Sequence, residues 1–321
     1  LDFWIIGSGI AGSTISKELS KKYSVLVVDK ARGPGGRSSN KRFKKNLSFD
    51  HGVQYISPKS KDFKKFLNFL QRKNIVKIWN GEHLDLTFEK KELNKKYIGK
   101  QGNNAISKFN LKNVDQVYKS TVKSIKFKKL FWEIKLDNKK FLQSKSIILT
   151  CPYPQLKKLA YKFLNKKILD LKINMQPNIT TMIALKNKKE VPISSIKFED
   201  DILGWAANEN SKKRFQSPIS LWTLQSTVKW AKKNINNYKR NHGVENALIK
   251  KFLSFTGIKK NNIIFKKTHG WKYSYNNRQT SMRSYWDKRK RIGVCADWFV
   301  GPKVESAWLS ANDLAKRIRK F

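Results

Sequence analysis

Two glycine-rich stretches near the N-terminus have the residue types and spacing of a nucleotide site. The first, GSGIAG at residues 7–12, follows the apolar run FWII and precedes a segment with helical spacing. In a G-x-G-x-x-G pattern Gly7 permits the tight turn, Gly9 lets a pyrophosphate approach the backbone, and Gly12 allows the helix to pack on the strand. The helix N-terminus then offers free amides and a positive dipole to phosphates. The stretch therefore predicts a dinucleotide site.

The second stretch, GPGGR at residues 33–37, indicates which dinucleotide is bound. It follows the apolar run SVLVVD, which ends on Asp29, 17 residues after Gly12. Such an acid accepts hydrogen bonds from an adenosine ribose, and a plain nicotinamide dehydrogenase has no use for a further glycine loop after it. Gly35 and Gly36 would let backbone lie against the pyrophosphate of the longer FAD, with Arg37 as a nearby cation. The alternative is a glycine hairpin with a solvated arginine.

The elements that must position these residues form a βαβ unit. The runs at 3–6 and 24–29 are typical of buried parallel strands, and Ala11, Ile15 and Leu19 share one face of the helix between them. Apolar runs at 146–150 and 291–296 are expected in the same sheet, which makes the nucleotide domain discontinuous. Alternating residues over 121–136 predict a hairpin, and the segment from Val304 predicts a closing amphipathic helix.

Composition restricts the class of protein less than the motifs do. The 321 residues carry a formal charge of +46, with 57 lysines against 12 arginines spread along the whole chain. We attribute this excess to a coding bias toward lysine, with selection for nucleic-acid or anionic-membrane binding as the alternative. No run of eighteen apolar residues occurs, so no membrane span is expected.

Cysteine usage and the opening residues predict a cytoplasmic location. Cys151 and Cys295 stand apart, without a CxxC or a cysteine–histidine cluster, so neither a disulfide framework nor a metal site is expected. The opening LDFWIIGSG has no signal-peptide pattern. Neither cysteine lies in a flavin-linking motif, and a non-covalently bound FAD is therefore expected. Oligomeric state cannot be inferred from these features.

Several motifs together resemble a known family. GSGIAG, DKARGPGGR, FDHGVQY at 49–55, ILTCPYPQ at 148–155 and CADWFVGPKVESAWLSA at 295–311 are similar to the successive flavin-contacting motifs of FAD-dependent amine-oxidase-like proteins. LGWAANENSKKR at 203–214, WTLQSTVKW at 222–230 and HGWKYSY at 269–275 resemble the bacterial renalases within that superfamily. Gln225 stands where the family pattern has histidine, and Ala296 where glycine is usual.

The resemblance implies an α/β architecture in two domains. A glutathione-reductase-like FAD-binding domain with a parallel central sheet would comprise residues 1–58, 102–159 and 268–321. An α+β substrate domain with an antiparallel sheet would comprise 60–101 and 160–267. The implied cofactor contacts are Gly7, Gly9, Ala11, Gly12, Asp29, Lys30, Gly36, Arg37, Gln54, Tyr55, Val122, Asp297 and Val304.

A tryptophan-rich middle is the candidate substrate pocket. Flat aromatic side chains can enclose a planar ligand against a flavin and exclude water, although tryptophans at strand spacing are also typical of a core. No nucleophile, general base or metal motif accompanies them, and hydride transfer to a flavin needs none. The pocket residues are Tyr55, Trp205, Trp222, Gln225, His269, Trp271 and Tyr273, with Trp298 as a further wall.

The activity that the resemblance implies is an oxidase reaction. The substrate would be a 2- or 6-dihydro isomer of NAD(P), which would leave as ordinary NAD(P)+, with oxygen as acceptor giving hydrogen peroxide. The enzyme-class alternative is a flavin amine oxidase or a desaturase-like oxidoreductase. A second alternative is a basic flavoprotein that binds nucleic acid or a membrane surface without catalysis.

Overall fold

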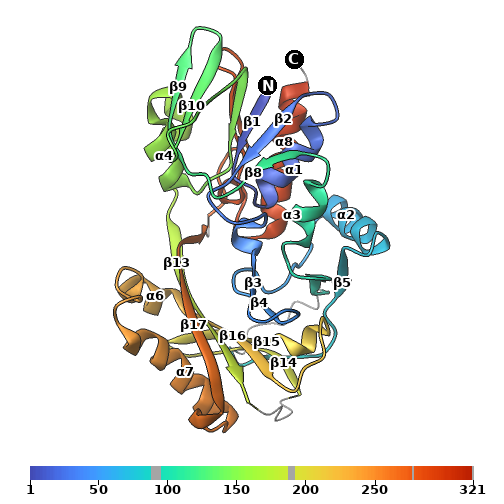
Figure 1. Ribbon diagram of the computed structural model, residues 1–321, viewed down its shortest axis with the longest axis vertical. Helices are drawn as coiled ribbons and strands as arrows, with labels where there is room; N and C mark the ends of the chain where they lie inside the picture. The colour runs from blue at the N-terminus through green and yellow to red at the C-terminus, as the bar shows by residue number, and fades with distance from the viewer. Residues whose placement is uncertain (88–94, 187–191, 277, 320–321) are drawn as a thin grey trace.

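The computed structural model describes residues 1–87, 95–186, 192–276 and 278–319. Figure 1 shows two stacked lobes, with both termini at the same end of the upper one. The upper lobe is built on a six-stranded sheet in the order β18-β19-β12-β1-β2-β8. The lower lobe is built on another six-stranded sheet, in the order β17-β13-β16-β15-β14-β6.

The predicted discontinuous sheet of the upper lobe is confirmed. β1 (Phe3–Ile6) pairs in parallel with β2 (Val25–Val28) on one side and β12 (Ser146–Leu149) on the other. β19 (Ile292–Val294) continues the sheet in parallel beyond β12, and β8 (Asp115–Val117) beyond β2. Only the edge strand β18 (Tyr285–Asp287) is antiparallel within this sheet. Buried parallel strands are continuous apolar runs, which is why sequence alone located them.

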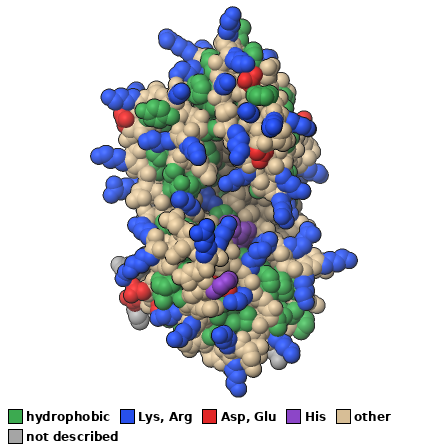
Figure 2. Space-filling view, turned by 60° about the vertical axis from the view of Figure 1, so that its left-hand side comes forward, with side chains coloured by type: hydrophobic (Ala, Val, Ile, Leu, Met, Phe, Trp, Pro, Cys, Tyr) green, Lys and Arg blue, Asp and Glu red, His purple; other side chains and the backbone are tan. Residues whose placement is uncertain are grey.

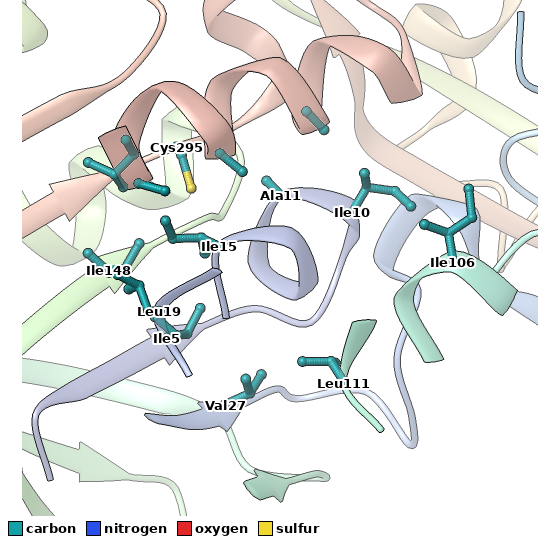
Figure 3. Close-up of a cluster of buried hydrophobic side chains, with 14 of the residues drawn as sticks. Ile5, Ile10, Ala11, Ile15, Leu19, Val27, Ile106, Leu111, Ile148 and Cys295 are labelled. Carbon is teal, nitrogen blue, oxygen red and sulfur yellow. The ribbon is translucent and has the colours of Figure 1, made fainter. Parts of the chain in front are cut away.

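Helices cover one face of this sheet and a smaller sheet covers the other. α1 (Ile10–Leu19) and α8 (Val304–Arg319) pack together on the first face, with α2 (Lys61–Arg72) and α3 (Ala105–Asn110) beside them. Figure 3 shows Ile15 and Leu19 of α1 lying among Ile5, Ile148 and Cys295. The other face carries α4 (Tyr153–Ala160) and the antiparallel strands β9 (Val122–Lys128), β10 (Phe131–Leu136) and β11 (Phe141–Ser144). The predicted hairpin over 121–136 is thus confirmed.

The lower lobe is a largely antiparallel sheet with helices on one face. β13 (Met175–Leu185) lies between β17 (Ile263–Asn276) and β16 (Ser220–Ser226), and β15 (Leu203–Asn208) and β14 (Ile193–Lys197) follow. β6 (Glu82–Asp85) pairs in parallel with β14 at the edge. α6 (Val228–Asn234) and α7 (His242–Thr256) cover the outer face through a core around Ile179, Trp222 and Phe252. The opposite face is directed toward the upper lobe (Figure 1).

Short elements connect the lobes. β3 (Asn40–Arg42) and β4 (Ser48–Asp50) form a hairpin between them, and β5 (Val76–Ile78) pairs with β7 (Tyr97–Gly99). α5 (Lys166–Leu169) precedes β13. The predicted domain boundary between residues 267 and 268 falls inside β17, because this strand stays hydrogen-bonded to β13 on both sides of it. His269 and Trp271 therefore belong to the lower sheet.

Candidate dinucleotide and substrate site

The two glycine loops pack directly on each other. Gly35 N donates to Ser8 O at 3.0 Å, and Gly9 and Gly35 form a parallel bridge. Gly36 has a φ of +53°, and a Cβ there would lie 3.1 Å from Gly9 Cα. A side chain at Gly36 would press on the first loop. The second loop thus completes one surface of bare backbone with the first.

The start of α1 has the features of a phosphate-binding helix N-terminus. No side chain caps the helix at Gly9, and its first turn contains no acid. A Cβ on Gly12 would lie 1.9 Å from Gly7 O, so the close approach of α1 to the turn after β1 requires glycine. The amides of this turn and the helix dipole are available to an anion. The arrangement fits the pyrophosphate of a dinucleotide.

Asp29 lies beside the first loop, at the end of β2. Its Oδ2 accepts hydrogen bonds from Ser8 N at 2.7 Å and Ser8 Oγ at 2.6 Å, and its Oδ1 accepts from Ala31 N at 2.9 Å. The carboxylate is therefore held between the two glycine loops, where sequence predicted a ribose contact. The neighbouring Lys30 is exposed, whereas Ala11 is buried in α1.

Arg37 and Asp297, both predicted cofactor contacts, form a bidentate ion pair. The two bonds from the guanidinium to the carboxylate measure 2.5 and 2.8 Å, and Arg37 Nη1 also donates to Ser274 O at 2.7 Å. Asp297 opens a 3-10 turn at 297–299 just before α8, whereas Ser274 lies on β17. This pair joins the second glycine loop to both lobes. Val304 at the start of α8 and Val122 at the start of β9 are half-buried.

A row of side chains crosses the inner face of the lower sheet. Trp205 of β15 pairs with Gln225 of β16, Gln225 with Thr180 of β13, and Thr180 with His269 of β17. Directly opposed residues share a face, so all four point the same way. Trp271 lies two residues beyond His269, and its ring centroid is 4.3 Å from the imidazole. We call these five residues the inner row.

Residues 51–55, which follow β4, contact the inner row. Gln225 Nε2 donates to Gly52 O at 2.7 Å, and Trp271 Nε1 donates to His51 O at 2.9 Å. The ring of Tyr55 lies 5.7 Å from that of Trp205. Five of the seven predicted pocket residues, Tyr55 among them, are thus brought to one surface at the junction of the lobes.

His51 joins this surface, although sequence analysis did not single it out. Its ring centroid lies 5.2 Å from that of His269 and 5.1 Å from that of Trp271. Burial, followed by the charges of His269 and Lys41, lowers the pKa of His51 to about 4, and the pKa of His269 is lowered by burial and nearby lysines. Both imidazoles are therefore neutral at pH 7. Within the described residues, His51 Nδ1 and Trp205 Nε1 are buried without a hydrogen-bond partner.

Three predicted residues lie elsewhere. Trp222 is fully buried on the outer face, 4.9 Å from Phe252 of α7, since it is three residues from Gln225 on the same strand and thus points the other way. Trp298 is fully buried against Phe299 in the upper lobe. Tyr273 lies in the irregularity of β17 opposite Pro177 and packs on the core of the upper lobe.

Gln54 hydrogen-bonds to a group of buried charged residues, and this group was not predicted from the sequence. Its Nε2 donates to Asp50 O and its Oε1 accepts from Lys212 Nζ at 3.3 Å. Lys212 is almost completely buried, with its Nζ 2.9 Å from Asp50 Oδ2 and 3.0 Å from Glu209 Oε2. We call Asp50, Glu209, Lys212 and Arg214 the buried ion cluster. Its sequence signal is the charge-rich stretch ENSKKR at 209–214.

The pKa values of the two carboxyl groups in the buried ion cluster are shifted in opposite directions. Burial disfavours the charge of Asp50, but Arg214 and Lys212 outweigh it and hold its pKa below the usual range. Burial dominates at Glu209 and raises its pKa, with Asp50 adding to the effect. Glu209 Oε2 is close to Lys212 Nζ without hydrogen-bond geometry, which agrees with the weaker stabilisation of its charge.

A family model of known proteins matches the N-terminal part of the chain. Residues 5–71 match the family model described as an NAD(P)-binding Rossmann-like domain. The chain therefore contains such a domain. An uncharacterized protein of Methanocaldococcus jannaschii is 43% identical over 51 residues, which are 16% of this chain and 14% of that protein. The match thus spans only a small part of that relative.

Solved structures define the fold over the whole chain. A proposed protoporphyrinogen oxidase from Exiguobacterium superposes with a TM-score of 0.75 at 8% identity, covering 99% of this chain and 98% of its own. Putrescine oxidase bound to putrescine superposes with a TM-score of 0.70 at 11% identity, covering 100% and 99%. The protein therefore shares the fold of these two oxidases. Among the described residues no helix is long and apolar enough to cross a membrane, and no cluster of metal-ligating side chains occurs.

Proposed function

We propose that the protein is an FAD-dependent oxidase of isomeric dihydronicotinamide dinucleotides. The overall reaction takes a 2- or 6-dihydro isomer of NAD(P), oxygen and a proton to NAD(P)+ and hydrogen peroxide. The fold shared with two oxidases and the Rossmann-like domain support a flavin oxidoreductase. The inner row supports the choice of substrate.

The residues at the two glycine loops fit FAD. Gly9, Gly36 and the first turn of α1 would hold the pyrophosphate, and Asp29 the adenosine ribose. Arg37 and Asp297 lie where the loops meet the second lobe and would hold the ribityl side. FAD bound there would supply the hydride-accepting chemistry. The further cofactor contacts inferred from the motifs, among them Lys30, Gln54, Val122 and Val304, remain part of the proposal.

The charge around the inner row carries the argument against an amine substrate. The row itself contains no carboxylate, and the cations Lys239, Lys41 and Lys30 are close enough to lower the pKa of His269. A protonated amine would be repelled here, whereas an anionic dinucleotide would be attracted. The buried carboxylates Asp50 and Glu209 are already paired with Lys212, and Asp297 with Arg37. The amine-oxidase alternative retains the support of the fold shared with putrescine oxidase.

The chain's own contribution is orientation and exclusion of water. Trp271 and Trp205 offer flat surfaces for a planar dihydropyridine ring, and neutral His269 can hydrogen-bond a carboxamide without adding charge. Gln225 is held by Gly52 and so fixes the edge of this surface. Alignment of the donating carbon decides which isomer reacts, since positioning is the main catalytic factor when no acid or base is required.

The deciding experiment is flavin reduction without oxygen, followed by stopped-flow absorbance. The purified protein should release FAD on acid precipitation, and the 2- and 6-dihydro isomers should bleach it much faster than ordinary NADH or putrescine. Admission of air should then yield peroxide. Faster bleaching by putrescine than by every dihydronicotinamide would replace the assignment with the amine-oxidase alternative.

A pair of histidine variants tests the site itself. His269→Ala should slow flavin reduction by on the order of tenfold while leaving FAD retention unchanged, because it lies on the proposed substrate side. His242→Ala, at an exposed position at the start of α7, is the matched control and should change neither. Equal losses of FAD and of activity in His269→Ala would contradict its placement.

A further inference from the structure

A cavity of about 530 Å³ lies where β13 begins and β17 ends. Buried Gln176 and Asn276 form part of its wall, and exposed Lys157, Lys172 and Arg278 lie around it. None of the described residues that line it is acidic. Figure 2, which brings the side of α4 and β13 forward, shows a hollow at mid-height bordered by lysine and arginine. Its size lies in the range of small-molecule sites.

Gln176 adds a hydrogen-bond acceptor to the positively charged surroundings of the cavity. The side chain is only 8% exposed, its Nε2 donates to Asn174 O at 3.4 Å, and its Oε1 has no partner among the described residues. A buried acceptor without a partner is unfavourable, so a ligand with a hydroxyl or N–H group would satisfy it. The cavity therefore suits a molecule that combines negative charge with a hydrogen-bond donor.

The cavity adjoins the inner row through the strand pair that carries both. Gln176 lies four residues before Thr180 of the inner row on β13, across the irregularity at Pro177, so the cavity and the inner row are neighbours along one strand. Asn276 Nδ2 donates to Trp298 O at 3.1 Å, directly after Asp297 in the chain. β13 and β17 therefore carry residues of both the cavity and the inner row.

We propose that this cavity binds the sugar and diphosphate of the dinucleotide substrate while its dihydropyridine ring lies on the inner row. Lys157, Lys172 and Arg278 would meet the phosphates, and a ribose hydroxyl would donate to Gln176 Oε1. The inference rests on the proposed function and deepens it, because it predicts that a dinucleotide binds more tightly than its nicotinamide riboside fragment.

The test compares substrates with and without phosphates in the FAD-loaded protein. Dissociation constants come from the concentration dependence of anaerobic flavin reduction, using the reactive dihydro isomer of NAD and the corresponding riboside. Calorimetric titration with NAD+ and with oxidised nicotinamide riboside gives a second readout that needs no turnover. In the wild type the dinucleotide should bind more tightly in both assays.

The variant combines Lys172→Gln with Arg278→Gln. It should raise the dissociation constant of the dinucleotide by about twofold to 30-fold, as expected for two exposed charge contacts, and leave that of the riboside within about twofold. The limiting rate of reduction should not change. A single Gln176→Leu variant should weaken both ligands, since both carry ribose.

A second basic groove supplies the matched control. It is about 430 Å³ and is lined by Arg240, Lys272 and Gly270 among others. Arg240→Gln with Lys272→Gln makes the same change of charge there and should leave both ligands unaffected. Equal weakening in the two double variants would show a general effect of net charge and overturn the proposal, as would a riboside that binds as tightly as the dinucleotide. If no dihydronicotinamide reduces the flavin, the proposed function fails, and the inference fails with it.

Discussion

At the scale of single residues, the buried ion cluster is notable because its charged groups have lost their hydration. Fully buried lysines are rare because the charge loses its hydration. Lys212 is held by Asp50 at the end of β4 and by Glu209 just after β15, so the cluster ties the hairpin between the lobes to the lower lobe through charges that water cannot screen. It also holds Gln54 and hence the segment that contacts the inner row.

The two carboxyl groups of the cluster should respond differently to neutralisation. Asp50→Asn should lower the free energy of unfolding by about 3–5 kcal/mol at pH 7, because it leaves Lys212 and Arg214 without their main partner. Glu209→Gln should cost clearly less, since burial already opposes the charge of Glu209. Urea denaturation of the FAD-loaded protein measures both. A larger loss for Glu209→Gln would contradict the assignment of charge within the cluster.

The pH dependence of these losses has a definite sign. The pKa of Glu209 is raised in the folded protein, so the wild type gains stability as the pH falls from above that pKa toward 4.5, its ordinary value. Glu209→Gln has no carboxyl group to protonate and lacks this gain. The unfolding free energy of the wild type should therefore rise relative to that of the variant as the pH falls toward 4.5. The pKa of Asp50 is lowered, so its contribution is present above pH 3.8 and is lost only below it. The Asp50→Asn deficit should therefore persist at pH 4.5.

At the scale of elements, the two glycine loops act as one unit. The loop after β2 is not a separate site, because its backbone lies on the loop after β1 through Gly9, Gly35 and Gly36. A conformational change in the second loop would therefore alter the pyrophosphate surface made by the first.

A pair of glycine variants measures this coupling. Gly36→Ala should weaken FAD binding by about fivefold to 30-fold, since a left-handed conformation costs an alanine about 1–2 kcal/mol and its Cβ would press on Gly9. Gly33→Ala, in the same loop with no atom within 4 Å of the added Cβ, should bind FAD normally. Titration of the FAD-free protein with FAD gives both constants. Unchanged binding in Gly36→Ala would show that the second loop does not shape the site.

Sequence predicted the frame of the molecule better than its pocket. The strands at 146–149 and 292–294 were recognisable because both of their faces are buried, and their apolar runs need no knowledge of neighbours. The pocket depends on which face of the sheet each side chain occupies. The sequence analysis assigned both Trp222 and Trp271 to the pocket, but only Trp271 is on the inner face. His51 was not singled out although it lies in the motif FDHGVQY, because its partners His269 and Trp271 are more than two hundred residues away in the chain.

At the scale of the whole molecule, positive charge is spread rather than gathered. Figure 2 shows lysine and arginine over the entire visible face, with few acidic side chains between them. A nucleic-acid-binding surface normally concentrates its cations along one stripe or patch. The distribution therefore favours a compositional origin of the +46 charge, with local consequences only where cations surround a cavity.

This interpretation makes a prediction about nucleic acid. Binding to duplex DNA should be detectable at low salt, independent of sequence, and lost as sodium chloride is raised to physiological strength, because each contact only displaces counterions. Fluorescence anisotropy with two unrelated duplexes at several salt concentrations measures this. Tight binding that persists at 150 mM salt with a preference for one duplex would favour the nucleic-acid-binding alternative.

The paired strands β13 and β17 also limit how the molecule can move. They are hydrogen-bonded to each other along most of their length and reach the junction side by side. A two-stranded ribbon bends less readily than a single connecting chain, and Arg37 ties the end of β17 to the second glycine loop. The lobes are thus braced against opening like a clamshell. We therefore expect ligand exchange to depend on side-chain movements at the junction more than on a hinge between the lobes.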